Sequence, residues 1–243
     1  MTSPHGWDRE RAAATARLAA VASTAPDAPV PTCPGWTVAR VAVHTGRIHR
    51  WVAAALTAPD GTEVPPAPRP APETDLGGWL VEGGDLLTVA FEAAGPGGAV
   101  RAPGWERSAP WWRRRTCHET VVHAWDVEAA VGVPTSIDGQ LAVDGIDEVV
   151  EVFLPTAFDL DAFGEPATLH LHATDDDLDG GEWLVAVGSD GVRSERRHAK
   201  GDVAVRGSAS DLLLWAWGRV PTSALDVMGD ADVAERYLAA TRY

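Results

Sequence analysis

The sequence predicts an α+β protein, with an N-terminal four-helix bundle followed by a small α+β domain. Up to about residue 158 the chain consists of long, alanine-rich segments separated by proline and glycine, which favour helices. From residue 167 onward, apolar and polar residues alternate in short segments, a pattern typical of strands. The change falls at residues 158–166. We therefore expect one domain at residues 1–160 and a second at residues 161–243.

The helices of the first part are bounded by stop signals. Four prolines lie between residues 26 and 34, and residues 59–72 hold six prolines and one glycine, so both segments are expected to be connections. Gly95 begins a GPGG run that ends the third helix. The fifth helix either packs on the bundle or links it to the second domain. The expected helices span residues 7–25, 36–58, 75–94, 109–131 and 139–158.

The second part combines short strands with two helices. The alternation TLHLH at residues 168–172 indicates the first strand, and SDG at residues 189–191 indicates a hairpin turn. Ser208 or Ser210 is expected to cap the helix that follows the last strand. The expected strands span residues 167–173, 183–187, 192–197 and 202–206, and the expected helices span residues 208–217 and 231–241.

The composition excludes several classes of protein. With 243 residues, 45% hydrophobic and 23% charged, the chain is typical of a globular protein rather than a disordered one. The net charge is −15, and residues 137–243 hold 21 acidic but only 8 basic residues, so nucleic acid and anionic membranes are not expected as partners. No apolar run reaches the roughly 18 residues of a membrane helix. Two cysteines without a CxxC pair and a polar start indicate a reduced, cytoplasmic protein.

Three residues on two expected helices have the chemistry of a metal site. Glu119 and His123 are four residues apart, so they project from the same face of one helix. His44 shares the apolar face of another helix with Val41 and Ile48, where burial of an unpaired imidazole costs on the order of 1–3 kcal/mol. A metal ion would satisfy all three residues and keep positions open for water or substrate. Zinc, nickel and iron(II) suit these ligands.

The same spacing allows a simpler interpretation. Glu119 and His123 can form a surface pair, and His44 can be a hydrogen-bonded core residue. Asp126, three residues after His123, could orient that histidine from behind the metal or pair with an arginine instead.

Other titratable residues are expected to have structural roles. His49 is expected on the exposed flank of its helix, and the arginines at 113–115 on a solvated face. His170 and His172 share one face of a strand, but the sequence supplies no third ligand nearby, so an exposed or packing role is expected. Cys117 is expected to be a buried, inert thiol.

Three segments carry longer motifs. They read CPGWTV at residues 33–38, RTCHETVVHAWDV at residues 115–127 and VRGSASDLLLWAWGR at residues 205–219. Together they resemble the mycothiol-dependent maleylpyruvate isomerase family, within the wider DinB-like group of four-helix metalloenzymes. The resemblance spans nearly the whole chain. It implies a DinB-like bundle and a C-terminal domain that closes over the site.

The resemblance also implies roles for individual residues. His44, Glu119 and His123 match the residues that hold a divalent metal in this family, usually zinc. Members commonly use a low-molecular-weight thiol, mycothiol, whose thiolate binds the metal and attacks an electrophile. Arg219 best matches an arginine implicated in activity, and it would pair with a substrate carboxylate. Alternatively, Arg219 stabilises the C-terminus of a helix.

We therefore expect a divalent-metal-dependent enzyme that uses a mycothiol-like thiol for isomerisation or thiol transfer. Its substrate would be a small electrophile that bears a carboxylate. With a maleylpyruvate-like substrate, addition of the thiolate to the alkene, rotation about the new single bond and elimination would give the trans product. Two alternatives stay open: a metal-dependent hydrolase on the same bundle, which needs no thiol, and a non-catalytic module that binds a metal or a ligand.

Overall fold

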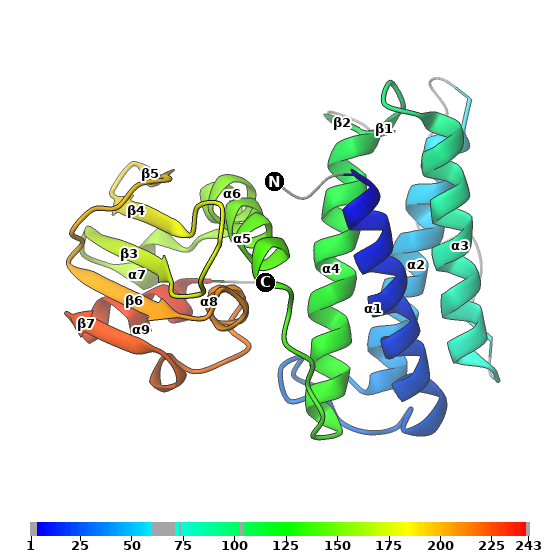
Figure 1. Cartoon of the computed structure of the whole chain (residues 1–243), viewed down its shortest axis with the longest axis horizontal. Helices are drawn as coiled ribbons and strands as arrows, with labels where there is room; N and C mark the ends of the chain where they lie inside the picture. Colours follow the sequence, from blue (N-terminus) through cyan, green and yellow to red (C-terminus); the bar gives the residue numbers. More distant parts are fainter. Residues whose placement is uncertain (1–3, 60–70, 73, 103–104, 242–243) are drawn as a thin grey trace. The chain divides into compact units, whose positions relative to one another are not determined.

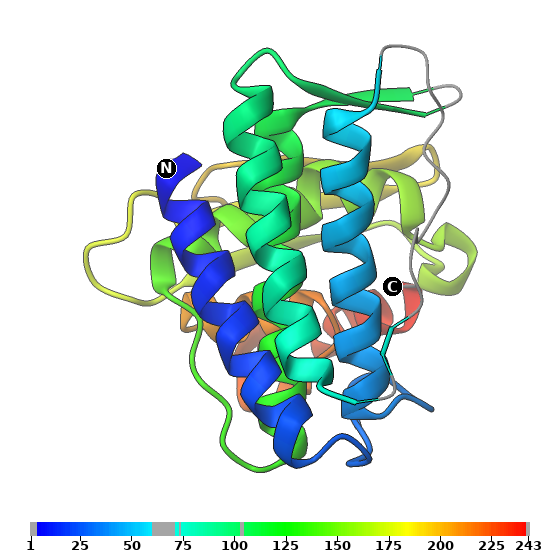
Figure 2. The same cartoon turned by 90° about the vertical axis from the view of Figure 1, so that its right-hand side faces the viewer.

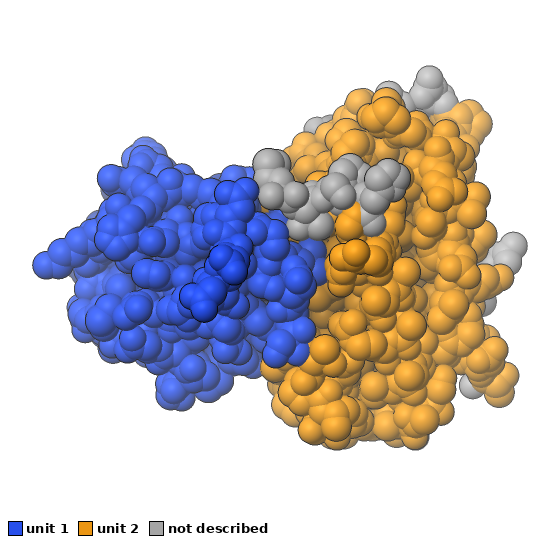
Figure 3. Space-filling view, viewed as in Figure 1, with its two compact units in different colours: residues 1–2, 136–243 blue, residues 3–135 orange. Residues whose placement is uncertain are grey.

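The computed structural model describes residues 4–59, 71–72, 74–102 and 105–241. The chain divides into two compact units, one ending at Thr135 and the other beginning at Ser136 (Figure 3). The expected class, a helical domain followed by a small mixed domain, is confirmed. Of the connection expected at residues 59–72, most lies outside the described residues. Within those ranges, no helix is both long enough and apolar enough to cross a membrane.

Four long helices form the first unit, close to the ranges that the sequence predicted. They lie side by side in both views (Figures 1 and 2). Thr37, Asp75 and Ser108 precede the second, third and fourth helices, and each side chain accepts a hydrogen bond from a backbone N–H of the first turn. The helices are α1 (Pro4–Thr24), α2 (Val38–Thr57), α3 (Leu76–Ala94) and α4 (Ala109–Ala130).

Helix α2 packs against two other long helices of the bundle. It packs extensively against α3 and also contacts α4. The approach to α3 depends on Gly46, because a Cβ at this position would lie 2.3 Å from the ring of Trp79. A short hairpin that the sequence analysis missed, β1 (Ala99–Ala102) and β2 (Trp105–Ser108), precedes α4. The helices that carry His44 and Glu119 are therefore neighbours.

The second unit is built on a five-stranded sheet with the order β5-β4-β3-β6-β7. The central strand β3 is antiparallel to β4 and parallel to β6. Leu169, Leu171 and Trp183 point to the buried face of the sheet, so the alternation places His170 and His172 on the opposite face. All four expected strands are present, and β7 is an additional edge strand. The strands are β3 (Ala167–Ala173), β4 (Glu182–Gly188), β5 (Gly191–Glu195), β6 (Val203–Gly207) and β7 (Asp226–Gly229).

The helix expected at residues 139–158 contains a wider, π-helical turn at Val149–Phe153. Pro155 follows this turn and has no N–H to donate to a preceding carbonyl, which accounts for the break in the regular pattern. The helix packs against α8 of the same unit, so the division at Ser136 lies earlier than the boundary expected near residue 160. The helices are α5 (Gly139–Glu148), α6 (Leu154–Ala157), α7 (Leu160–Phe163), α8 (Ala209–Ala216) and α9 (Ala231–Ala240), with a 3-10 turn at Thr222–Ala224.

Candidate functional site

The structure brings His44, Glu119 and His123 together. One donor atom from each lies within 4.8 Å of the other two. His44 Nε2 is 2.9 Å from Glu119 Oε1, and the rings of His44 and His123 lie edge to face with their centres 5.2 Å apart. The first residue comes from α2 and the other two from α4, four residues apart, as the helical spacing requires.

The electrostatics of this group centre on Glu119. Its side chain is almost fully buried, and Arg115, one turn earlier in α4, lies 3.2 Å from Oε2. Burial alone would raise the pKa of Glu119, but the positive charge of Arg115 and the hydrogen bond with His44 outweigh it and lower this pKa to about 2. The arginines at 113–115 were expected on a solvated face. For Arg113 and Arg115, whose side chains are 14% and 15% exposed, this was wrong. The charge of Arg115 keeps the buried carboxylate of Glu119 ionised.

Asp126 is placed behind His123. Its Oδ2 lies 2.9 Å from His123 Nδ1, and its Oδ1 accepts a hydrogen bond of 2.6 Å from the Thr32 hydroxyl. Cys33 Sγ is 3.5 Å from Oδ2. Asp126 is fully buried, so these contacts fix its position. The contact at Nδ1 leaves Nε2 as the nitrogen of His123 that can bind an ion.

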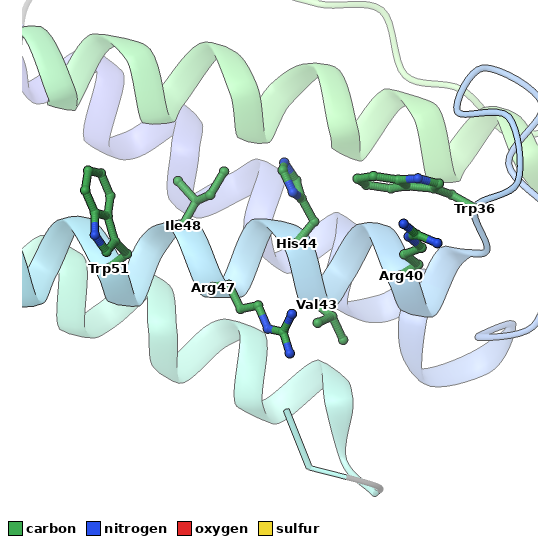
Figure 4. Close-up of a pocket in the computed structure, with 7 residues that line it drawn as sticks. All are labelled: Trp36, Arg40, Val43, His44, Arg47, Ile48 and Trp51. Carbon is green, nitrogen blue, oxygen red and sulfur yellow. The ribbon is translucent and has the colours of Figure 1, made fainter. Parts of the chain in front are cut away.

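A groove of about 350 Å³ runs along α2 beside this group (Figure 4). His44 points from the middle of α2 toward α4, with Trp36 and Arg40 at one end of the groove and Trp51 at the other. The Arg40 guanidinium lies 4.9 Å from the Trp36 ring centre. The groove therefore combines flat apolar walls with positive charge. Its lining residues are Trp36, Arg40, Val43, His44, Arg47, Ile48 and Trp51.

Two further predictions for the bundle can be compared with the structure. His49 was expected on an exposed flank, which is wrong: it is 1% exposed, and its Nε2 lies 2.8 Å from the Thr120 hydroxyl of α4. Burial, and then the charges of Arg11 and Arg50, lower the pKa of His49 to about 3, so this imidazole is neutral. Cys117 is fully buried, as expected.

Arg219 belongs to the second unit, directly after α8. Gly218, with φ of +70°, donates to Trp215 O, and the backbone N–H of Arg219 donates to Leu214 O, which together form a Schellman motif. The guanidinium donates a hydrogen bond of 2.8 Å to Trp217 O. The side chain is thus anchored at the C-terminus of the helix, a place where positive charge is favourable.

The donor set of the bundle fits a divalent metal ion. Two imidazole nitrogens and one carboxylate oxygen are ligands that zinc takes in catalytic sites, with further positions left open. Arg115 occupies one oxygen of Glu119 and leaves the other facing His44. Asp126 fixes the ring of His123 in the way that carboxylates fix metal-binding histidines.

Comparison with known protein families gives two matches along the chain. Residues 7–128 match the model of the mycothiol maleylpyruvate isomerase N-terminal domain, and residues 140–236 match the C-terminal domain of the same family. The chain belongs to the mycothiol maleylpyruvate isomerase family. This confirms the resemblance seen in the sequence motifs.

Solved structures also match the chain over most of its length. The crystal structure of a mycothiol-dependent maleylpyruvate isomerase is 17% identical, with a TM-score of 0.60, and the match covers 93% of this chain and 95% of that one. A mutant of that isomerase matches at 16% identity with the same TM-score and coverage. At these identities the likeness establishes a shared fold. No curated protein sequence matches this chain.

Proposed function

We propose that the protein is a divalent-metal-dependent enzyme that uses a low-molecular-weight thiol, of the mycothiol type, to isomerise a small electrophilic substrate bearing a carboxylate. Thiol transfer is the related reaction that the same site could perform. The observation that carries the proposal is the convergence of His44, Glu119 and His123 beside a groove with aromatic and basic walls. Membership of the mycothiol maleylpyruvate isomerase family supports the choice of reaction and thiol.

The three donors would hold zinc, or nickel or iron(II) in its place. A divalent ion at this position would lower the pKa of a bound thiol and keep the thiolate available at neutral pH. Arg115 keeps Glu119 ionised, and Asp126 presents the correct nitrogen of His123. Both neighbours thus prepare the ligands before any ion or substrate arrives.

The substrate carboxylate would be recognised by arginine. Arg40 and Arg47 line the groove next to His44, and a guanidinium can form two parallel hydrogen bonds with a carboxylate. Arg219 is the third candidate, on the strength of the family motif. Trp36 and Trp51 would cover the flat faces of an unsaturated substrate and exclude water.

The first experiment measures metal content by mass spectrometry on protein purified without a histidine tag. We expect His44→Ala and Glu119→Gln each to carry one equivalent of metal fewer than the unsubstituted chain, with unchanged circular dichroism. Glu82→Gln is a matched control, since Glu82 is an exposed carboxylate of the same bundle that also pairs with an arginine, Arg50. A metal content that is equal in all four proteins would refute the proposed metal site.

A second experiment separates the three classes of function. The metal-loaded protein is assayed with unsaturated oxo-carboxylates, with and without thiol, and with esters as hydrolase substrates. We expect isomerisation only when thiol is present. Ester hydrolysis without thiol would instead identify a hydrolase, and binding of metal and thiol without any turnover would identify a binding module.

A further inference from the structure

Three imidazoles and one carboxylate of the second unit converge on one face of its sheet. One donor atom from each of His170, His172, Glu182 and His198 lies within 4.8 Å of all the others. The two histidines of β3 are neighbours on this face, and Glu182 starts β4 directly opposite His172. His198 comes from the connection between β5 and β6. Three separate segments thus meet at one point.

Glu182 is the centre of this cluster. Its Oε2 is 2.9 Å from His170 Nε2 and 2.5 Å from His198 Nδ1. The ring centres of His170 and His198 are 5.2 Å apart, and those of His170 and His172 are 5.6 Å apart. A tetrahedral zinc ion with bonds of about 2.0–2.2 Å requires ligand atoms about 3.3–3.6 Å apart. Small rotations of these side chains would reach that spacing.

The charges of the cluster suit a cation. Zinc takes charged carboxylates and neutral imidazoles as ligands, and the cluster offers one carboxylate and three imidazoles. Arg206, opposite His172 on β6, pairs with Asp226 at 3.4 Å, which offsets its charge.

Burial is graded across the cluster. The side chain of His170 is 6% exposed, that of Glu182 is 31% exposed and that of His198 is 76% exposed. An ion can therefore reach the cluster from solvent on the side of His198, while His170 lies in the interior. His170 would therefore be a buried, fixed ligand, and His198 would be an exposed ligand on the connection between β5 and β6.

We propose that His170, His172, Glu182 and His198 form a second divalent-metal site, for which zinc is the preferred ion. Four protein ligands fill a tetrahedral coordination sphere, so the site is structural and ties the β5–β6 connection to the sheet. Binding places the ion between Glu182 and the two imidazoles that it contacts, and any proton they share leaves to solvent. The site depends on the second unit alone and is independent of the proposed function of the bundle.

The test uses the full-length chain with the bundle donors removed by His44→Ala and His123→Ala. Equilibrium dialysis against zinc, followed by mass spectrometry, is expected to find one equivalent of zinc in this background. Adding His198→Ala or Glu182→Gln is expected to abolish it. His198→Ala removes a side chain that is mostly exposed, so the fold should survive, and circular dichroism checks this. Glu195→Gln on β5 is the matched control, because Glu195 is an exposed carboxylate outside the cluster.

Zinc is also expected to raise the thermal midpoint of the background protein and of the Glu195→Gln control, but not of the variants with His198→Ala or Glu182→Gln. The proposal is overturned if the background binds no zinc, or if those two variants still bind one equivalent. Either result is distinct from failure of the bundle site. That failure would appear as unchanged metal content on substitution of His44 alone.

Discussion

His123 shows how a single side chain is prepared for one task. Asp126 contacts Nδ1, while Thr32 holds the other oxygen of that carboxylate in place. Since the imidazole can turn only with its partner, its second nitrogen stays directed at His44 and Glu119. Arg115 likewise fixes the orientation of the Glu119 carboxylate, because its guanidinium lies 3.2 Å from Oε2. The candidate donor atoms are thus positioned by residues that would not themselves bind the proposed ion.

The role of Asp126 can be measured through metal affinity. Asp126→Asn keeps the size of the side chain but removes the charge behind His123, so we expect zinc affinity in the bundle to fall by about 10- to 100-fold. Competition with a chromophoric chelator measures this change. Glu82→Gln, an exposed carboxylate on α3, should leave the affinity unaltered. Equal affinity in Asp126→Asn and the unsubstituted protein would show that Asp126 does not support His123.

Helical spacing placed Glu119 and His123 on one face of α4 and His44 on the apolar face of α2, and the structure brings the three side chains together. Helical spacing could also have found Arg115, which stands four residues before Glu119 and obeys the same rule. His198 could not be found in this way. Its approach to Glu182 depends on the path of a connection between strands, and such a path leaves no periodic pattern in the sequence.

Helix α2 joins its neighbours through polar as well as apolar contacts. His49 reaches across to Thr120 of α4, and the Thr120 hydroxyl itself donates to Thr116 O. Nε2 of His49 is therefore the nitrogen that carries the hydrogen, and the ring is neutral. The contact fixes α2 against α4 within one turn of Glu119, so it sets the separation of the two helices that supply the donors.

The neutral state of His49 predicts a dependence of stability on pH. The pKa of His49 is about 3 in the folded protein and near 6.5 when unfolded. Between these values the unfolded chain binds one more proton, so acid destabilises the fold by up to about 1.4 kcal/mol per pH unit. His49→Gln should reduce this slope. Urea unfolding between pH 4.5 and 6.5 measures it, and comparison of the two proteins removes the contribution of Glu119, which both contain. The prediction would be contradicted if the free energy of unfolding had the same dependence on pH in both proteins.

Among the helices and strands, the sequence predicted the ones that carry strong local signals. The prolines and glycines that end the helices place the four bundle helices within a few residues of their observed ends. The elements that it missed are short. β7 and the β1–β2 hairpin have four residues per strand, too few for alternation to be recognised, and they exist because a neighbouring strand supplies hydrogen-bond partners.

On the scale of the whole molecule, the candidate residues are divided between two units. The candidate metal ligands His44, Glu119 and His123 belong to the unit that ends at Thr135, and Arg219 belongs to the other. Metal binding in the bundle would need only the first unit, whereas any role of Arg219 belongs to the second. Substitutions in the second unit should therefore separate catalysis from metal content.

Arg219→Gln tests this separation. If the guanidinium pairs with the substrate carboxylate, kcat/KM should fall by about 10- to 100-fold, the value of a charged hydrogen bond of about 1.5–3 kcal/mol, while metal content stays unchanged. Steady-state assays with thiol present measure the effect. Arg193→Gln, an exposed arginine of β5, is the control. A lower thermal midpoint with unchanged kcat/KM would instead show that Arg219 only stabilises the end of α8.

The parallel pairing of β3 with β6 has a consequence for how the second unit folds. The hairpin of β4 and β5 lies between these two strands along the chain, so the pairing of β3 with β6 joins residues that are distant in the sequence. Such non-local pairing is slow compared with the docking of adjacent helices. We expect the bundle to acquire its native contacts first. Until β6 pairs with β3, the apolar residues Leu169 and Leu171 lie next to an open sheet edge, which favours aggregation.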